Sequence, residues 1–236
     1  MTGLTFVTNH TKKRYLRWTL NERLQHWIMA VSFIMLVLTG FGLKYPNAWW
    51  VQPIIRLDHL AALRGTVHRI FAAIFMLLGI YHIFYITLTK RGRALGKAFI
   101  PGIQDLRDFL QNIAYNFGFR KHPPVFGHFS YIEKAEYLAL IWGTIIMGIS
   151  GLMLWFNELT LKFFPKWILD LMTVIHFYEA WLATLAIVVW HFYYVIFNPD
   201  TYPLNKSMID GRLTEKEMRH EYFREWEELE KETLQD

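Results

Sequence analysis

The stretch that decides the fold spans residues 167–197 and reads WILDLMTVIHFYEAWLATLAIVVWHFYYVIF. It exceeds the roughly 20 predominantly apolar residues that a helix needs to cross a bilayer. Three further apolar runs, at about residues 27–43, 70–88 and 137–156, come close to that length. The sequence therefore predicts four membrane helices, at about residues 24–44, 64–89, 134–157 and 167–197.

The composition agrees with a membrane domain, since 53% of the residues are hydrophobic and only 19% are charged. The polar remainder is too small for a separate soluble catalytic domain of roughly 100 residues. We expect residues 1–197 to form one transmembrane domain and residues 198–236 to form a tail. The absence of Cys excludes disulfides, Cys-bound iron–sulfur clusters and c-type haem attachment in this sequence.

Positive charges are distributed unevenly between the two sides of the predicted membrane domain. Residues 1–23 carry five Lys and Arg, the connection 89–134 carries eight, and the tail from 198 carries six, against five on the other side. The positive-inside rule then places both termini in the cytoplasm. The predicted fold class is an all-α integral membrane four-helix bundle with cytoplasmic termini and a cytoplasmic C-terminal helix. We attribute the net charge of +5 to the orientation of the chain in the membrane, and we expect no nucleic-acid partner.

The polar segments contain two helix signals and no evident internal repeat. Asp105 to Phe117 has the pattern of a short amphipathic helix lying along the inner surface. Thr214 and Glu217 have capping-box spacing ahead of a charged stretch to about Leu234. That stretch is expected to be a surface helix, either a docking element or a solvated face.

Five histidines lie in or at the rim of the apolar runs: His26, His68, His82, His176 and His191. Ionisable side chains in membrane helices are costly and usually serve a ligand, a proton path or a partner. His68 and His82 are 14 residues apart, which places them within about 40° of one helix face and about 21 Å apart. His176 and His191 are 15 apart, about 60° past four full turns and about 22 Å apart.

The second and fourth helices run parallel, so their histidines meet at matched depths. One imidazole from each of two facing helices is the axial pair that a b-type haem needs, inside the apolar slot of a four-helix bundle. Three other interpretations compete: hydrogen-bonded core histidines, a non-haem metal site, and a proton or metal-ion transporter. The metal site is disfavoured because neither H-E-x-x-H nor repeated Glu-x-x-His patterns occur, and the transporter because no intramembrane Asp or Glu is expected to join the histidines.

The sequence resembles the cytochrome b subunits of membrane formate dehydrogenases and nickel–iron hydrogenases over nearly its whole length. The resemblance rests on Arg23-x-x-His26-Trp27, on Thr39-Gly40, and on the histidines at 68, 176 and 191. It implies a bacterial inner-membrane protein with two haem b groups that exchanges electrons with quinone. It also implies that His26 pairs with His191 and that His68 pairs with His176 as axial iron ligands.

His82 departs from that family pattern and keeps a second ligand scheme open. His82 and His191 both lie about seven residues from the inner ends of their helices, whereas His26 lies at the rim. The spacing of His82 is similar to that of quinol-oxidising cytochromes b, in which one helix supplies a ligand to each haem. The resemblance favours His26 as the partner of His191, with His82 as the alternative.

Further residues are assigned to the haem propionates and to quinone. Arg69 on the outer side, and Arg23 or Arg17 on the inner side, are candidate counter-ions of the anionic propionates. The resembling family forms its quinone pocket from the segment before the third helix, which here is His128 to Glu136. The candidate quinone residues are His128, Ser130 and Glu133, with Glu136 as a second carboxylate that could relay protons. Ser130 and Glu133 also fit a simple helix N-cap.

The expected function is that of a membrane cytochrome b that transfers electrons between the quinone pool and a partner. The partner is expected to be a periplasmic or membrane oxidoreductase subunit, namely a dehydrogenase, a hydrogenase or a multihaem cytochrome c. The chain would then be the electron-transfer and quinone-reactive subunit of a larger complex. A non-redox transporter that uses intramembrane histidines is the alternative.

Overall fold

The computed structural model describes residues 13–55, 59–199 and 201–233, which fall into two compact units. We call residues 21–101 and 132–205 the membrane unit. The described parts of the remainder, residues 13–20, 102–131 and 206–233, are called the terminal unit.

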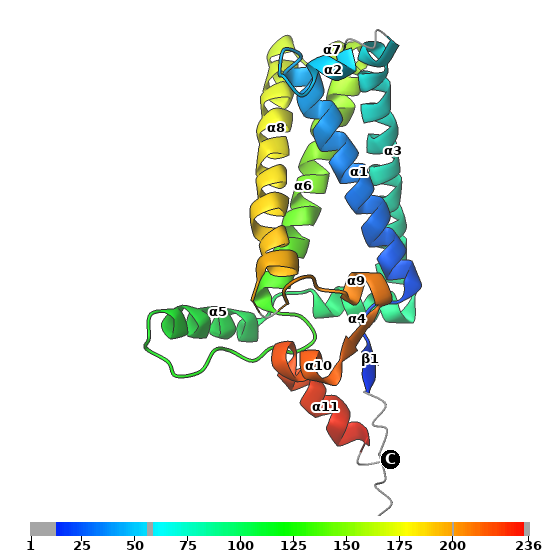
Figure 1. Ribbon diagram of the computed structural model, residues 1–236. Coiled ribbons are helices and arrows are strands. Elements are labelled where there is room, and N and C mark those ends of the chain that lie inside the picture. The colour runs from blue at the N-terminus through cyan, green and yellow to red at the C-terminus, as the bar shows by residue number, and fades with distance from the viewer. Residues whose placement is uncertain (1–12, 56–58, 200, 234–236) are drawn as a thin grey trace, which may run out of the picture. The chain divides into compact units, whose positions relative to one another are not determined.

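The membrane unit is built on four long helices that lie side by side (Figure 1). They are α1 (Leu20–Lys44), α3 (His59–Leu88), α6 (Tyr131–Trp155) and α8 (Lys166–Leu185), the last of which continues without a break to Phe197. Each contains a span that is long and apolar enough to cross a membrane: Leu20–Lys44, Leu63–Leu88, Tyr131–Trp155 and Lys166–Phe197. The prediction of an all-α four-helix membrane bundle is confirmed.

The membrane helices present large apolar side chains outward and small or polar ones inward. Ile80, Ile145 and Val189 are all more than half exposed, whereas Ser32 and Ser150 are fully buried. Lipid is as apolar as these outward residues, so burying them between helices gains nothing in a bilayer. Helix association there depends on close packing and on interhelical hydrogen bonds, and these are concentrated around the histidines.

The last membrane helix changes its winding between its two histidines. It is α-helical to Leu185 and then forms two π-helical stretches, η1 (Ala186–His191) and η2 (Tyr193–Phe197). A π-helical turn accommodates an extra residue within an α-helix, and such turns are frequent at functional sites. The winding therefore accounts for the 15-residue spacing of His176 and His191 against the 14 of His68 and His82.

Short helices connect the long ones: α2 (Gln52–Ile55), α7 (Asn157–Phe163) and α4 (Lys90–Ala98). The chain turns tightly from α3 into α4, where the Thr89 hydroxyl accepts a hydrogen bond from the Gly92 amide at 2.9 Å. A Cβ atom at Gly92 would lie 2.0 Å from the carbonyl oxygen of Tyr85, so only glycine fits this turn.

The terminal unit combines a strand pair with short helices. Strand β1 (Arg14–Leu16) pairs antiparallel with β2 (Arg212–Thr214), with Tyr15 opposite Leu213. Its small core consists of Leu213, Met218 and Tyr222, with partly buried Tyr15, Trp226 and Leu229 packed against it. The unit's helices are α5 (Ile103–Asn116), α9 (Ser207–Asp210), α10 (Glu215–Glu221) and α11 (Phe223–Thr233).

The two helices expected in the polar segments are both present, one as expected and one divided. The amphipathic helix expected at Asp105 to Phe117 is α5, and the capping box of Thr214 and Glu217 is confirmed at the start of α10. The charged stretch after Thr214 forms two helices divided at Tyr222, where a single helix to about Leu234 was expected. Leu234 lies outside the described residues. The division into domains 1–197 and 198–236 stays a prediction.

Candidate functional site

His68 on α3 and His176 on α8 face each other near one end of the bundle. Their ring centroids are 6.4 Å apart, with an angle of 68° between the ring planes. We call this pair the second histidine set. The Nδ1 atom of His68 lies 2.9 Å from the Thr39 hydroxyl, and that of His176 lies 2.9 Å from the Ser150 hydroxyl.

The two hydroxyl contacts determine which ring nitrogen carries the proton. Thr39 donates its hydroxyl hydrogen to the carbonyl oxygen of Met35 at 2.5 Å, and Ser150 donates to that of Ile146 at 2.7 Å. A hydroxyl has only one hydrogen to donate, so each oxygen accepts from the Nδ1–H of its histidine. The Nε2 lone pair of both rings is therefore left available for a metal.

Two glycines fit closely against the same rings. A Cβ atom at Gly40 would lie 3.2 Å from Cε1 of His68, and one at Gly151 would lie 3.2 Å from Cε1 of His176. A larger residue at either position would have to push the imidazole aside. Gly143 instead allows the approach of Glu179, and Gly148 faces open space. Of these glycines, Gly40 and Gly151 are therefore the ones that position a histidine.

The first histidine set, His26, His82 and His191, lies toward the opposite end of the bundle. The rings of His26 and His191 have centroids 6.4 Å apart and planes inclined at 44°. Glu136 on α6 places its Oε2 atom 3.1 Å from Nδ1 of His191. Nδ1 of His26 is buried and has no hydrogen-bond partner among the described residues.

His82 is held by hydrogen bonds at both ring nitrogens. Gln25 places Oε1 2.8 Å from Nδ1, and Tyr137 places its hydroxyl 2.9 Å from Nε2. Because Gln25 directs its amide nitrogen to Asn21 at 3.0 Å, its oxygen accepts from the Nδ1–H of His82. The Tyr137 hydroxyl then donates to Nε2 and occupies the lone pair that a metal would need.

These contacts repeat between the two halves of the membrane unit. One half consists of α1 and α3, and the other consists of α6 and α8. In each half, a polar residue on the earlier helix contacts one histidine of the later helix. A hydroxyl residue followed by a glycine, beginning 14 positions after that polar residue, contacts the other histidine. The members in α1 and α3 are Gln25, Thr39, Gly40, His82 and His68; those in α6 and α8 are Glu136, Ser150, Gly151, His191 and His176. The sequence shows no evident internal repeat, but the contacts around the histidines correspond between the two halves.

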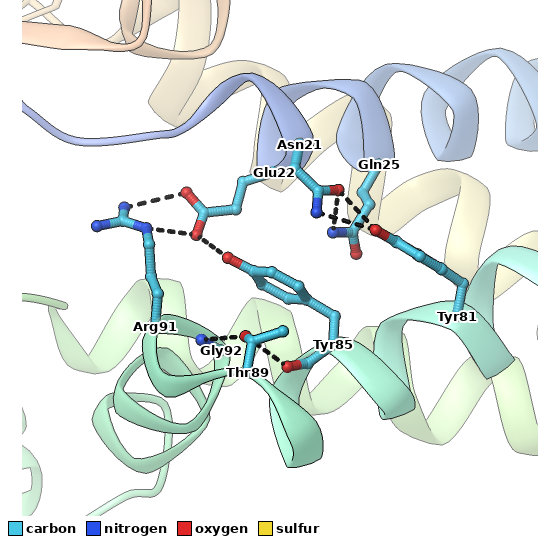
Figure 2. A network of polar contacts seen from close by, with 8 residues as sticks. All are labelled: Asn21, Glu22, Gln25, Tyr81, Tyr85, Thr89, Arg91 and Gly92. Carbon is cyan, nitrogen blue, oxygen red and sulfur yellow. Dashed lines mark hydrogen bonds and ion pairs between the residues drawn. The ribbon is translucent and has the colours of Figure 1, made fainter.

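A polar network fixes the beginning of α1 (Figure 2). Glu22 is buried and accepts hydrogen bonds from Arg91 on α4 at 2.7 and 3.0 Å. The Tyr85 hydroxyl on α3 donates to the same carboxylate at 2.7 Å. These bonds join α1, α3 and α4 about one helical turn from His26, and so they fix the part of α1 that carries this residue.

The arginines predicted to bind propionates lie in different surroundings. Arg69 is exposed beside His68, with its guanidinium 5.7 Å from the centroid of the Trp155 ring. Arg23 is partly buried three residues before His26. Arg17 is buried in the terminal unit, where it forms an ion pair with Glu225 at 3.3 Å. Arg17 is therefore committed to a structural contact.

The three candidate quinone residues belong to two units. Glu133 lies in the first turn of α6 in the membrane unit, while His128 and Ser130 lie in the terminal unit. Ser130 is buried, and Nδ1 of His128 bonds to the carboxylate of Glu225. Burial by itself raises the pKa of Glu225, but the bond from His128 and the nearby charges outweigh it, so this pKa lies below its ordinary value.

Comparison with known proteins identifies the family of the chain. The sequence profile described as prokaryotic cytochrome b561 matches residues 17–211. This chain belongs to that family. The cytochrome b556(fdo) subunit of formate dehydrogenase from Escherichia coli strain K12 is 22% identical over 218 residues, covering 92% of this chain and 94% of its own length. The same subunits from strains O6:H1 and O157:H7 match equally.

Membership of the cytochrome b561 family makes this chain a membrane cytochrome b that acts in electron transfer, with haem b as its cofactor. The facing histidines fit that cofactor. Metal–nitrogen bonds to histidine are about 2.0 Å and each nitrogen lies about 1.1 Å from its ring centre, so two rings that bound one ion from opposite sides would have centroids about 6.2 Å apart. Both facing pairs, at 6.4 Å, match this separation.

Sequence reasoning treated Glu136 only as a proton relay to quinone and missed its contact with a histidine. It expected no intramembrane Asp or Glu beside the histidines, but Glu136 on α6 contacts His191. Glu179 also lies within α8, and its Oε1 atom would be 3.2 Å from a Cβ at Gly143. The 14-residue interval shared by Gln25–Thr39 and Glu136–Ser150 is a signal that could have linked Glu136 to a histidine. Among the described residues, no group of three or more His, Asp or Glu could hold a metal ion.

Proposed function

We propose that this cytochrome b binds two haem b groups, one at each histidine set, and carries electrons between quinone and a partner oxidoreductase. The observation that carries the proposal is the pair of facing imidazoles at each end of one bundle, both at 6.4 Å between centroids. Haem iron, when bound, takes up and releases one electron at a time. Two such groups spaced along the helices provide a path through the membrane.

The proposed axial ligands are His68 with His176 and His26 with His191. The tautomers support the first pair, because hydroxyl oxygens accept from both Nδ1 atoms and direct the Nε2 lone pairs to the metal. For the second pair, the engagement of both His82 nitrogens favours His26. His82 then acts as a hydrogen-bonded residue that ties α3 to α1 and α6.

The quinone site is proposed at the end of the bundle that carries the first histidine set, at the segment before α6. Within the membrane unit, Glu133 is proposed to supply a carboxylate that exchanges protons with water. His128 and Ser130 belong to the terminal unit, and for them the resemblance alone supports a role in bonding a quinone carbonyl. The positive charge at the termini and in residues 89–134 supports a cytoplasmic location for this end. Arg69 and Arg23 are proposed to pair with the propionates of the two haems.

The partner is proposed to be an oxidoreductase subunit on the opposite side of a bacterial inner membrane. Support comes from the relatives, which are cytochrome b subunits of formate dehydrogenase. A dehydrogenase, a hydrogenase or a multihaem cytochrome c could each exchange electrons with such a cytochrome b. The chain itself is then the electron-transfer subunit of the complex.

The test is haem quantification on the purified full chain. A pyridine haemochrome assay is expected to give two haem b per chain, with a reduced-minus-oxidised spectrum typical of bis-histidine iron. Addition of a quinol analogue should reduce the haem in the wild type. Colourless protein would support a transporter instead, and one haem per chain would restrict the proposal to a single pair.

A further inference from the structure

The two halves of the membrane unit differ in one chemically decisive position. Gln25 and Glu136 occupy matching places, each bonded to Nδ1 of a histidine on the following helix. Gln25 presents a neutral amide oxygen to His82, whereas Glu136 presents a carboxylate oxygen to His191. The carboxylate lies behind the histidine that faces another imidazole, and the amide lies behind the histidine that bonds to Tyr137.

The second histidine set provides another comparison. His68 and His176 are backed by the hydroxyl oxygens of Thr39 and Ser150, which are neutral acceptors. Of the four proposed ligands, His191 has a carboxylate at Nδ1 in the described structure. The other oxygen of Glu136 is buried and has no hydrogen-bond partner among the described residues, so no second bond at that oxygen draws charge away from this carboxylate.

A carboxylate acceptor alters the donor strength of the imidazole that it backs. Hydrogen bonds to a charged acceptor are about twice as strong as those between neutral groups. The Nδ1–H of the imidazole becomes more polarised, and its Nε2 becomes a more basic ligand. A more basic axial ligand stabilises ferric over ferrous iron, which lowers the midpoint potential of the haem.

We propose that Glu136 is a positioning residue that orients His191 and lowers the midpoint potential of the haem held by His26 and His191. The inference rests on the proposed function, because it needs a haem at the first histidine set. It adds a reason for the two haems to differ: one ligand of this haem is backed by a carboxylate, and both ligands of the other are backed by hydroxyls. Glu136 touches the ligand and not the iron.

The experiment is a redox titration of the full, haem-loaded chain, followed by visible absorption. Glu136→Gln replaces the carboxylate by the amide that the other half of the bundle carries at Gln25. It is expected to raise one of the two midpoint potentials and leave the other near its wild-type value, with haem content unchanged. Glu136→Asp keeps the charge on a shorter side chain and should shift the same potential upward by less.

The matched control is Glu179→Gln, which removes a carboxylate that lies against Gly143 in the same bundle. If it raises the potential as much as Glu136→Gln does, the effect is one of general charge and the proposal is wrong. Two unmoved potentials in Glu136→Gln would also overturn it. Should Glu136→Gln lose haem, Glu136→Asp becomes the deciding variant, and unmoved potentials there refute the proposal. Wild-type protein without haem contradicts the proposed function, and one haem per chain restricts it to a single pair. Both results are distinct from a failure of the proposal about Glu136.

Discussion

The Tyr137 hydroxyl donates to Nε2 of His82 across 2.9 Å, so the one lone pair that His82 could offer to iron is already engaged. His26 has the opposite situation, since its ring faces His191 and its Nδ1 has no partner in the described structure. The two candidate ligands for the first histidine set therefore differ in what their nitrogens already bind.

We predict that His26→Ala loses one of two haems, while His82→Gln keeps both. The amide of Gln at position 82 can still bond to Tyr137, so the bundle should remain folded. Haem content per chain, measured by pyridine haemochrome, checks both variants. The opposite pattern would show that His82 is the ligand and that Tyr137 moves away when haem binds.

Gly151→Ala should disturb the haem at the second histidine set. Its new Cβ would lie 3.2 Å from Cε1 of His176, closer than side chains normally pack, so the imidazole must shift by a few tenths of an ångström. We expect partial loss of one haem or a change in its absorption maximum. Gly148→Ala, on the same helix and facing open space, is the control and should leave the spectrum unchanged.

Hydropathy was sufficient to predict the four spans. Histidine spacing was sufficient to predict that the second and fourth helices carry histidines at matched depths. Spacing could not distinguish His26 from His82, because the distinction depends on what Tyr137 and Gln25 contact. The repeat escaped detection because it is carried by a few widely spaced positions whose side chains differ between the halves.

The strand pair and the divided tail could not be predicted for a different reason. Strands β1 and β2 have three residues each and lie about 200 positions apart, so neither shows a periodic pattern of its own. The end of α10 at Tyr222 depends on burial of that ring in the small core, which is a tertiary effect.

Arg91→Gln should destabilise the start of α1. Glu22 would keep its bond from Tyr85 but lose two charge-assisted bonds while remaining buried. Arg91 is itself partly exposed, so solvent screening reduces the loss to about 1 kcal/mol. A lower thermal midpoint of the purified protein is the expected readout. Lys90→Gln removes the same charge from an exposed neighbour and should leave that midpoint near the wild-type value.

The terminal unit should lose stability in acid. The pKa of Glu225 in the folded chain lies below its ordinary value of 4.5, so its stabilising contribution is complete above pH 4.5 and is lost as the pH falls through the lowered value. Hydrogen exchange of residues 206–233, corrected for the intrinsic rate at each pH, should therefore speed up below pH 4.5. Glu225→Gln should flatten this dependence, whereas Glu228→Gln, at an exposed position, should retain it.

The charge distribution leads to a prediction about orientation that can be tested cleanly because the chain has no Cys. A single introduced Cys is then the only thiol. Lys121→Cys lies in the basic connection predicted to be cytoplasmic, and Lys162→Cys lies in α7 on the opposite side of the predicted topology. In spheroplasts, whose outer membrane has been removed and whose inner membrane is intact, a membrane-impermeant maleimide should label Lys162→Cys at once. Lys121→Cys should react only after the inner membrane is permeabilised. Labelling of Lys121→Cys in intact spheroplasts would show that the orientation is the reverse of the predicted one. The proposed quinone site would then face the periplasm.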